Sequence, residues 1–172
     1  ERALKDGPNE LVLRFESPDL GGVKLDKTWT LKRGAYDMAV RHEIVNTGTA
    51  PVSPQLYLQI VRDGNKPPGE SSFYSTFTGP AVYTEAKKYQ KIEFKDIENN
   101  KAEFVKESAN GYGAMVQHYF ASAWLLKDGI QRDLFARKVD NNLYAIGMIT
   151  STAAVEPGAT KAIDVAGPGK AD

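Results

Sequence analysis

The sequence predicts an all-β fold, a sandwich or a barrel of short strands with little helix. Apolar and polar residues alternate with a period of two in many short runs, which is typical of half-buried strands. Clusters of Gly, Pro, Asn and Asp separate these runs, as in "DGNKPPGE", "DIENN" and "EPG". No window of a dozen residues shows a convincing helical period. Many short strands about 8–12 residues apart favour a sandwich or barrel over an α/β fold.

The first strands follow from this alternation. We expect strands over residues 23–31, 36–45 and 55–61, with "KRG" turning between the first two. Arg41 and Glu43 lie on the polar face of the second strand. The apolar faces of the three strands comprise Val23, Leu25, Trp29 and Leu31, then Tyr36, Met38, Val40 and Ile44, then Leu56, Leu58 and Ile60.

The later part of the chain is predicted to continue in short strands. They cover residues 82–84, 89–94, 102–105, 113–120, 123–126, 133–138, 142–151 and 161–165. Residues 84–92, "TEAKKYQKI", could form a short turn of helix. The long polar loop at residues 63–72 is expected to be the most mobile segment.

Length and composition limit the classes of function. The 172 residues fit one domain, 1–172, with a core of its own. The 22 basic and 22 acidic residues balance, which gives no reason to expect nucleic acid or an anionic membrane surface as partner. The absence of cysteine excludes disulfides, thiolate metal sites and a cysteine nucleophile. No run approaches the roughly 20 apolar residues of a membrane span, and we expect the chain to be a fragment of a longer protein.

The two histidines are the only candidates for imidazole chemistry. His42 falls in the apolar series of its strand, and His118 sits in "GYGAMVQHYFASAW", a run with two largely apolar faces. A general base must lie within hydrogen-bond reach of its substrate, and zinc requires three or four converging ligands. The sequence marks no such partners. Both histidines are therefore interpreted as packed side chains, with no metal and no cofactor.

One segment has the composition of a protected sheet edge. Residues 81–107 mix short apolar runs with many Lys and Glu residues. Lysine-rich short strands prevent indiscriminate pairing of edge strands, and such an edge is also where another chain can dock. A merely solvated hairpin is the alternative reading. The candidate interaction surface comprises Tyr83, Lys87, Lys88, Tyr89, Lys91, Glu93 and Lys95.

Three motifs carry a resemblance to a known family. "WTLKRGAYDMAVRHEIVNTGTAPV", "FYSTFTGPAVYTEAKKYQKIEF" and "GYGAMVQHYFASAW" occur in this order, followed by "LYAIGMI", "VEPGAT" and "AGP". Together they resemble the large periplasmic domain of the YidC membrane protein insertases of Gram-negative bacteria. The resemblance covers residues 23–168. The third motif is the most specific, because it fixes many aromatic and small residues.

The resemblance implies a fold and a role. The family's domain is a twisted antiparallel β-sandwich (supersandwich) similar to galactose mutarotases, placed at the periplasmic face of the inner membrane between the first two transmembrane helices. The implied role is non-catalytic interaction or scaffolding in membrane protein insertion. The implied partners are nascent membrane proteins, the Sec translocon and SecDF. The family's strands before "ELVLRF" and its final helical linker are absent here.

Two alternatives remain open. A sandwich of this kind could bind a carbohydrate or a peptide in a cleft on one sheet face, where exposed aromatic rings would contact the ligand. An enzyme of mutarotase type would need a histidine acid and a carboxylate base in one cleft, and only His42 and His118 could supply the first.

Overall fold

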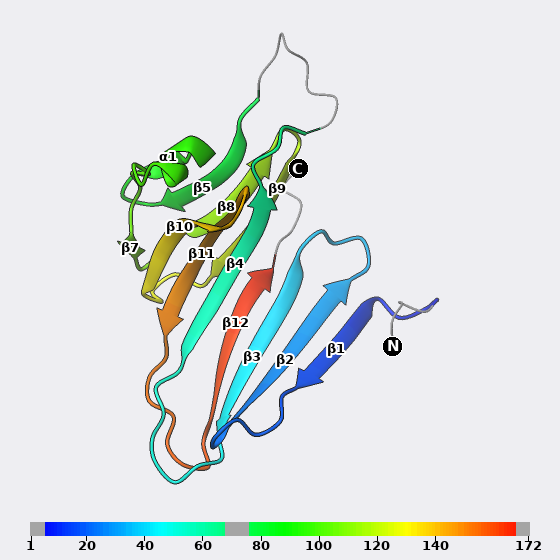
Figure 1. The fold of residues 1–172 in the computed structure, drawn as a ribbon. Coiled ribbons are helices and arrows are strands. Elements are labelled where there is room, and N and C mark those ends of the chain that lie inside the picture. The colour runs from blue at the N-terminus through cyan, green and yellow to red at the C-terminus, as the bar shows by residue number, and fades with distance from the viewer. Residues whose placement is uncertain (1–5, 68–75, 168–172) are drawn as a thin grey trace. The chain divides into compact units, whose positions relative to one another are not determined.

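The computed structural model describes residues 6–67 and 76–167, so the predicted mobile loop at 63–72 lies partly outside the described residues. The chain is almost entirely antiparallel β-structure, as predicted (Figure 1). It forms two compact units. The first contains the described residues up to Leu56 together with Ser151–Gly167, and the second contains Tyr57–Thr150.

The first unit is built on four antiparallel strands in the order β1 (Glu10–Glu16), β2 (Val23–Lys32), β3 (Met38–Asn46) and β12 (Thr160–Gly167). The register places Val40 opposite both Trp29 of β2 and Val165 of β12. Because side chains alternate across a strand, one face of β3 buries Val40, His42 and Ile44. The prediction that His42 points with the apolar residues of its strand is therefore confirmed.

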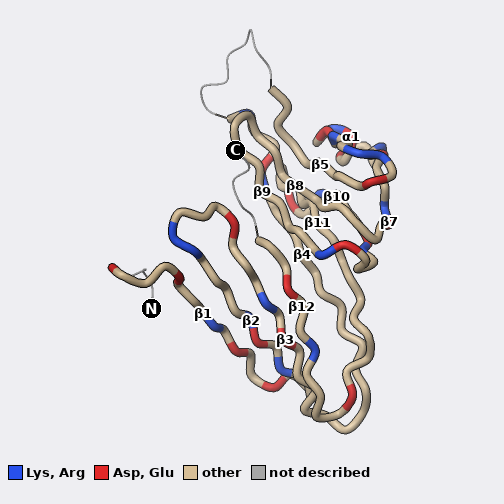
Figure 2. Tube along the Cα trace, turned by 180° about the vertical axis from the view of Figure 1, so that it is seen from behind, with Lys and Arg blue, Asp and Glu red and all other residues tan. Residues whose placement is uncertain are grey.

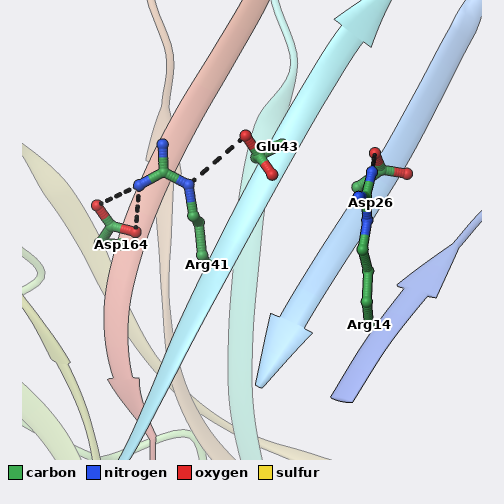
Figure 3. A network of polar contacts seen from close by, with 5 residues as sticks. All are labelled: Arg14, Asp26, Arg41, Glu43 and Asp164. Carbon is green, nitrogen blue, oxygen red and sulfur yellow. Dashed lines mark hydrogen bonds and ion pairs between the residues drawn. The ribbon is translucent and has the colours of Figure 1, made fainter. Parts of the chain in front are cut away.

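The opposite face of the same four strands carries a ladder of charges (Figure 3). Arg41 contacts Asp164 at 3.1 Å and Glu43 at 3.5 Å, and Arg14 donates to Asp26 at 2.8 Å. Figure 2 shows charges of both signs along these strands. Exposed pairs of this kind each contribute at most about 1 kcal/mol, so they keep the face soluble more than they hold the strands together.

The second unit is a sandwich. One sheet has the order β9 (Phe120–Leu126), β8 (Tyr112–Gln117), β5 (Thr78–Thr84) and β6 (Lys88–Lys91). The other has the order β4 (Gln55–Asp63), β11 (Leu143–Ser151), β10 (Arg132–Asp140) and β7 (Glu107–Ser108). The sheets pack face to face: a Cβ on Gly113 would lie 3.1 Å from Ile146, and the Trp124 indole donates to the Gln59 carbonyl at 3.0 Å.

A buried arginine organises one end of this sandwich. Arg132, the first residue of β10, is 1% exposed. Its guanidinium donates to five main-chain carbonyls at 2.7–3.2 Å. These acceptors are Ala109, Gly111, Leu126, Lys127 and Ile130. The loops before β8, after β9 and before β10 are therefore tied to one side chain.

The structure corrects two predictions in the segment that follows β5. Residues 84–92, predicted as a possible helical turn, form the β5–β6 hairpin. The strand predicted over 89–94 ends at Lys91, and helix α1 (Phe94–Glu98) follows. This helix is too short to show a periodic pattern. It is held in place by the burial of Ile97 and by the packing of the Phe94 ring on the Tyr144 ring, whose centroids are 4.6 Å apart.

Residues 102–105, predicted as a strand, are irregular. The Val105 amide donates to the side chain of Gln90 at 3.1 Å instead of to a strand main chain, and Phe104 is buried. The period-two pattern is misleading here, because burial of alternate residues arises from an irregular segment held by side-chain contacts.

The strand predicted over 113–120 is confirmed over residues 113–117 and extends three residues too far. β8 ends at Gln117, and His118 and Tyr119 form a tight turn closed by the Gln117–Phe120 pair. His118 is exposed, with a φ of 38° at the turn, so the interpretation of this side chain as packed is wrong. No local signal marks this turn, because it contains neither Gly, Asn, Asp nor Pro.

Candidate interaction surface

The hairpin of β5 and β6 forms one edge of its sheet. β6 is the last strand in the order, and within the described residues it pairs only with β5, in the register Tyr83–Tyr89 and Thr84–Lys88. The amide of Ile92 donates to the carbonyl of Pro80 at 2.9 Å and closes the pairing. The side of β6 away from β5 is the edge on which a further strand could pair.

A row of tyrosines crosses this end of the sheet. The register places Tyr83 of β5 opposite Tyr89 of β6 and opposite Tyr112 of β8. The rings of Tyr83 and Tyr112 stack with centroids 5.5 Å apart. Leu125 of β9 lies opposite Tyr112 and is exposed, so the row continues over four strands. Amphipathic rings in a row are typical of surfaces that bind other molecules.

Charges flank the tyrosine row at the turn of the hairpin. Lys88 contacts Glu85 at 2.7 Å and lies 6.0 Å from the Tyr83 ring centroid. The hydrogen bond from Lys88 lowers the pKa of the Glu85 carboxyl, and the same bond raises the pKa of Lys88. Burial raises the pKa of Tyr89, with a smaller effect from Tyr112. The lysine and the glutamate are both charged at neutral pH.

The remaining predicted residues spread along the same segment. Lys87 is exposed in the turn, and Lys95 is exposed on α1. Lys91 lies over the Phe77 ring at 5.2 Å, and together with Glu93 it lines a cavity of about 440 Å³. The structure thus brings Tyr83, Lys88 and Tyr89 together and places the other four around them.

Sequence reasoning misses two members of this surface, Tyr112 and Leu125. Tyr112 lies in "GYGAMVQHYFASAW", whose alternation predicts a strand buried on both faces, and Leu125 follows this run directly. Only the pairing register of β8 with β5 and β9 reveals them. The row could have been found from the sequence by testing registers that bring aromatic residues of neighbouring strands opposite one another.

Neither histidine is paired with a carboxylate among the described residues. The His118 Nδ1 lies 2.7 Å from the Thr76 hydroxyl. His42 has an Nδ1 without a hydrogen-bond partner in the described part of the chain. Burial, and to a lesser degree Lys27, lowers the pKa of His42 to about 4, so this imidazole is neutral at pH 7. In the described ranges no three His, Asp or Glu side chains cluster in a way that could hold a metal ion.

Solved structures with a similar fold are galactose-mutarotase-like. A galactose mutarotase related enzyme from Lactobacillus acidophilus superposes with a TM-score of 0.58 at 6% identity, over 95% of this chain and 68% of that chain. A putative aldose 1-epimerase from Klebsiella pneumoniae superposes with a TM-score of 0.55 at 12% identity, over 97% of this chain and 52% of that chain. The class of protein defined by the fold is therefore a mutarotase-like β-sandwich.

The sequence comparisons then identify the family. The sequence profile described as YidC periplasmic domain matches residues 1–167. Membrane protein insertase YidC of Aromatoleum aromaticum is 46% identical over 100% of this chain and 32% of its own length. The same protein of Burkholderia cenocepacia strain HI2424 is 51% identical over 91% of this chain and 28% of its own length. This chain belongs to the YidC periplasmic domain family.

The chain spans about a third or less of the length of these relatives. Over the described residues, helices long and apolar enough to cross a membrane are absent.

Proposed function

We propose that this chain is the periplasmic, non-catalytic domain of a membrane protein insertase, and that the whole protein inserts membrane proteins at the bacterial inner membrane. The observation that supports this most strongly is the 46–51% identity, over 91–100% of the chain, to proteins named membrane protein insertase. Likeness to mutarotases at 6–12% identity concerns the fold only. Nascent membrane proteins are the implied substrates.

The domain's own role in this proposal is interaction. The tyrosine row, the Lys88–Glu85 pair and the unpaired side of β6 together offer aromatic contacts, charges and a strand edge. The Sec translocon and SecDF are the proposed partners, carried over from the family resemblance. A surface of this kind needs no catalytic group, and its binding energy is expected to come from the tyrosines.

The proposal is tested on the full-length protein that contains this chain. Its reading frame is expected to encode apolar helices before Glu1 and after Asp172. Reconstituted into lipid vesicles, the full-length protein should insert a small single-span membrane protein that inserts poorly into protein-free vesicles. Failure of insertion by a correctly folded preparation, or a reading frame without such helices, would overturn the proposal.

A carbohydrate-binding role is the second candidate, favoured by the exposed Tyr89 and the half-buried Tyr83 and Tyr112 of the row, since sugars stack on aromatic rings. Titration of the chain with mono- and oligosaccharides should then shift the NMR resonances of Tyr83, Tyr89 and Tyr112. Unchanged spectra across a broad sugar panel would reject this role and leave the interaction role standing.

A further inference from the structure

A cavity lies between β10 and α1, and its lining includes no residue of the tyrosine row. It has a volume of about 400 Å³, within the range of pockets that bind small ligands. Its apolar lining is Ile97, Ala102 and Ala136. Its charged lining is Glu98, Lys106, Arg137 and Lys138, three cations against one carboxylate.

The single carboxylate of this cavity is already engaged. Glu98 contacts Lys138 at 2.9 Å and accepts a hydrogen bond from the Tyr144 hydroxyl. These two hydrogen bonds, the one from Tyr144 first, lower the pKa of Glu98, so it is ionised at neutral pH. Lys138 is therefore neutralised locally, and the remaining positive charge in the cavity comes from Lys106.

Lys106 and Arg137 are held by aromatic rings instead of by acids. The Lys106 ammonium lies 3.3 Å from the Phe104 ring centroid, and the Arg137 guanidinium lies 5.0 Å from that of Phe135 and 5.5 Å from that of Tyr57. Within the described residues neither cation contacts a carboxylate. The Arg137 guanidinium donates to the Tyr57 hydroxyl of β4, so it is directed across β11 and away from the cavity-facing edge of β10. Lys106 is therefore the cation available to an anionic ligand.

The main chain of β10 is open on the same side. β7 covers only the start of β10, pairing Arg132 and Asp133, and the Leu134 amide donates to the Lys106 carbonyl at 2.6 Å. Alternate residues of a strand direct both main-chain groups to the same side, so Ala136 and Lys138 also direct theirs away from β11. No main-chain bond joins these two residues to another described segment on this side.

We propose that this cavity binds a short, extended, acidic peptide segment of a partner protein, which pairs with β10 at Ala136–Lys138 and places a carboxylate beside Lys106. The main chain of β10 offers N–H donors and C=O acceptors in alternation, which another peptide main chain matches on both counts. A lipid phosphate only accepts hydrogen bonds and would leave the carbonyls unpaired. This site is separate from the tyrosine row and does not depend on the insertase proposal.

The binding test uses the 172-residue chain and short peptides, followed by NMR. The peptide acetyl-Thr-Glu-Val-Glu-Thr-amide is expected to shift the amide resonances of Ala136, Lys138 and Lys106 and to slow hydrogen exchange at the first two. The same peptide with Lys in place of Glu should bind at least about tenfold more weakly, since like charges repel. Alternate amides of the peptide can be N-methylated in two ways, at the odd or at the even positions. The form in which the methylated amides face β10 should not bind, because it lacks the donors that pair with β10, whereas the other form should still bind.

Two variants locate the site. Lys106→Glu should weaken binding of the acidic peptide at least about tenfold, and Lys106→Gln by a smaller factor. Lys161→Glu, which reverses an exposed charge on β12, should leave binding unchanged and serves as the matched control. Spectra of unaltered dispersion show that each variant is folded. Should Lys106→Glu fail to fold, the N-methylated peptides and Lys106→Gln still decide the question.

Three results would overturn the proposal. The first is binding of phosphatidylglycerol vesicles or inorganic phosphate at these residues with no response to the acidic peptide. The second is a peptide response that maps to β6 instead of β10. The third is equal affinity for all N-methylated forms, which would mean that charge alone attracts the peptide.

Discussion

Arg132 is the side chain on which the second unit depends most. It is almost fully buried, and burial lowers its pKa while five carbonyls accept its hydrogen bonds. Arg132→Met leaves these acceptors without donors and is expected to lower the free energy of unfolding by about 3 kcal/mol or more. Urea denaturation measures this loss in the free energy of unfolding. Arg41→Met, which removes an exposed ion pair, should cost less than about 1 kcal/mol, and equal effects of the two would contradict this account.

His42 makes stability depend on pH. Its folded pKa of about 4 lies below the ordinary value of 6.5, so the unfolded chain binds a proton more readily in this interval. Stability is therefore full above pH 6.5 and falls as the pH drops toward 4, by at most about 3 kcal/mol. Denaturation series between about pH 6.5 and pH 5 should show this loss. His42→Met should flatten the dependence, and an unchanged slope would show that another group is responsible.

At the scale of elements, the loop that enters β8 depends on Gly111. Its φ is +84°, and a Cβ there would lie 1.9 Å from the Tyr83 carbonyl oxygen. Gly129 provides a matched control, because its φ is +87° and nothing lies within 4 Å of a Cβ. Gly129→Ala should cost about 1–2 kcal/mol from the left-handed backbone alone. Gly111→Ala should cost clearly more, measured by thermal denaturation; equal costs would refute the close approach.

The same scale shows why some elements are predictable from the sequence and others are not. β3 is predictable because it buries one face, with Val40, His42 and Ile44, and exposes a charged one. The turn at His118 is not, because an exposed His-Tyr pair joins two apolar strands without a turn residue. Helix α1 is not predictable either, because its five residues are stabilised by contact with Tyr144, which is distant in the sequence.

The candidate site is only partly predictable for a related reason. Composition marks Lys87, Lys88 and Tyr89 as an edge, and the structure places β6 last in its sheet. The tyrosine row also needs Tyr112, whose neighbours are set by pairing between strands that are about thirty residues apart in the sequence. Register of this kind is a property of the folded sheet, and local patterns do not contain it.

At the scale of the whole molecule, family and fold agree. The YidC periplasmic domain profile covers residues 1–167, and the mutarotase-like sandwich predicted from that resemblance is the fold observed. The prediction of a single domain over 1–172 stays a prediction beside the two compact units of the structure. The proposed interaction role therefore concerns surfaces of the sandwich, and the chain covers about a third or less of the longer relatives named for insertion.

Site-specific photo-cross-linking in the full-length protein tests the central claim, that the β5–β6 edge is the interaction surface. A photoreactive residue replaces Lys87, Tyr89 or Lys95 in turn, with exposed Lys32 of β2 and Lys161 of β12 as control positions. Irradiation of native membranes is expected to capture a Sec component or a nascent membrane protein from the edge positions and not from the controls. Capture from the control positions alone, with none from the edge, would contradict the claim.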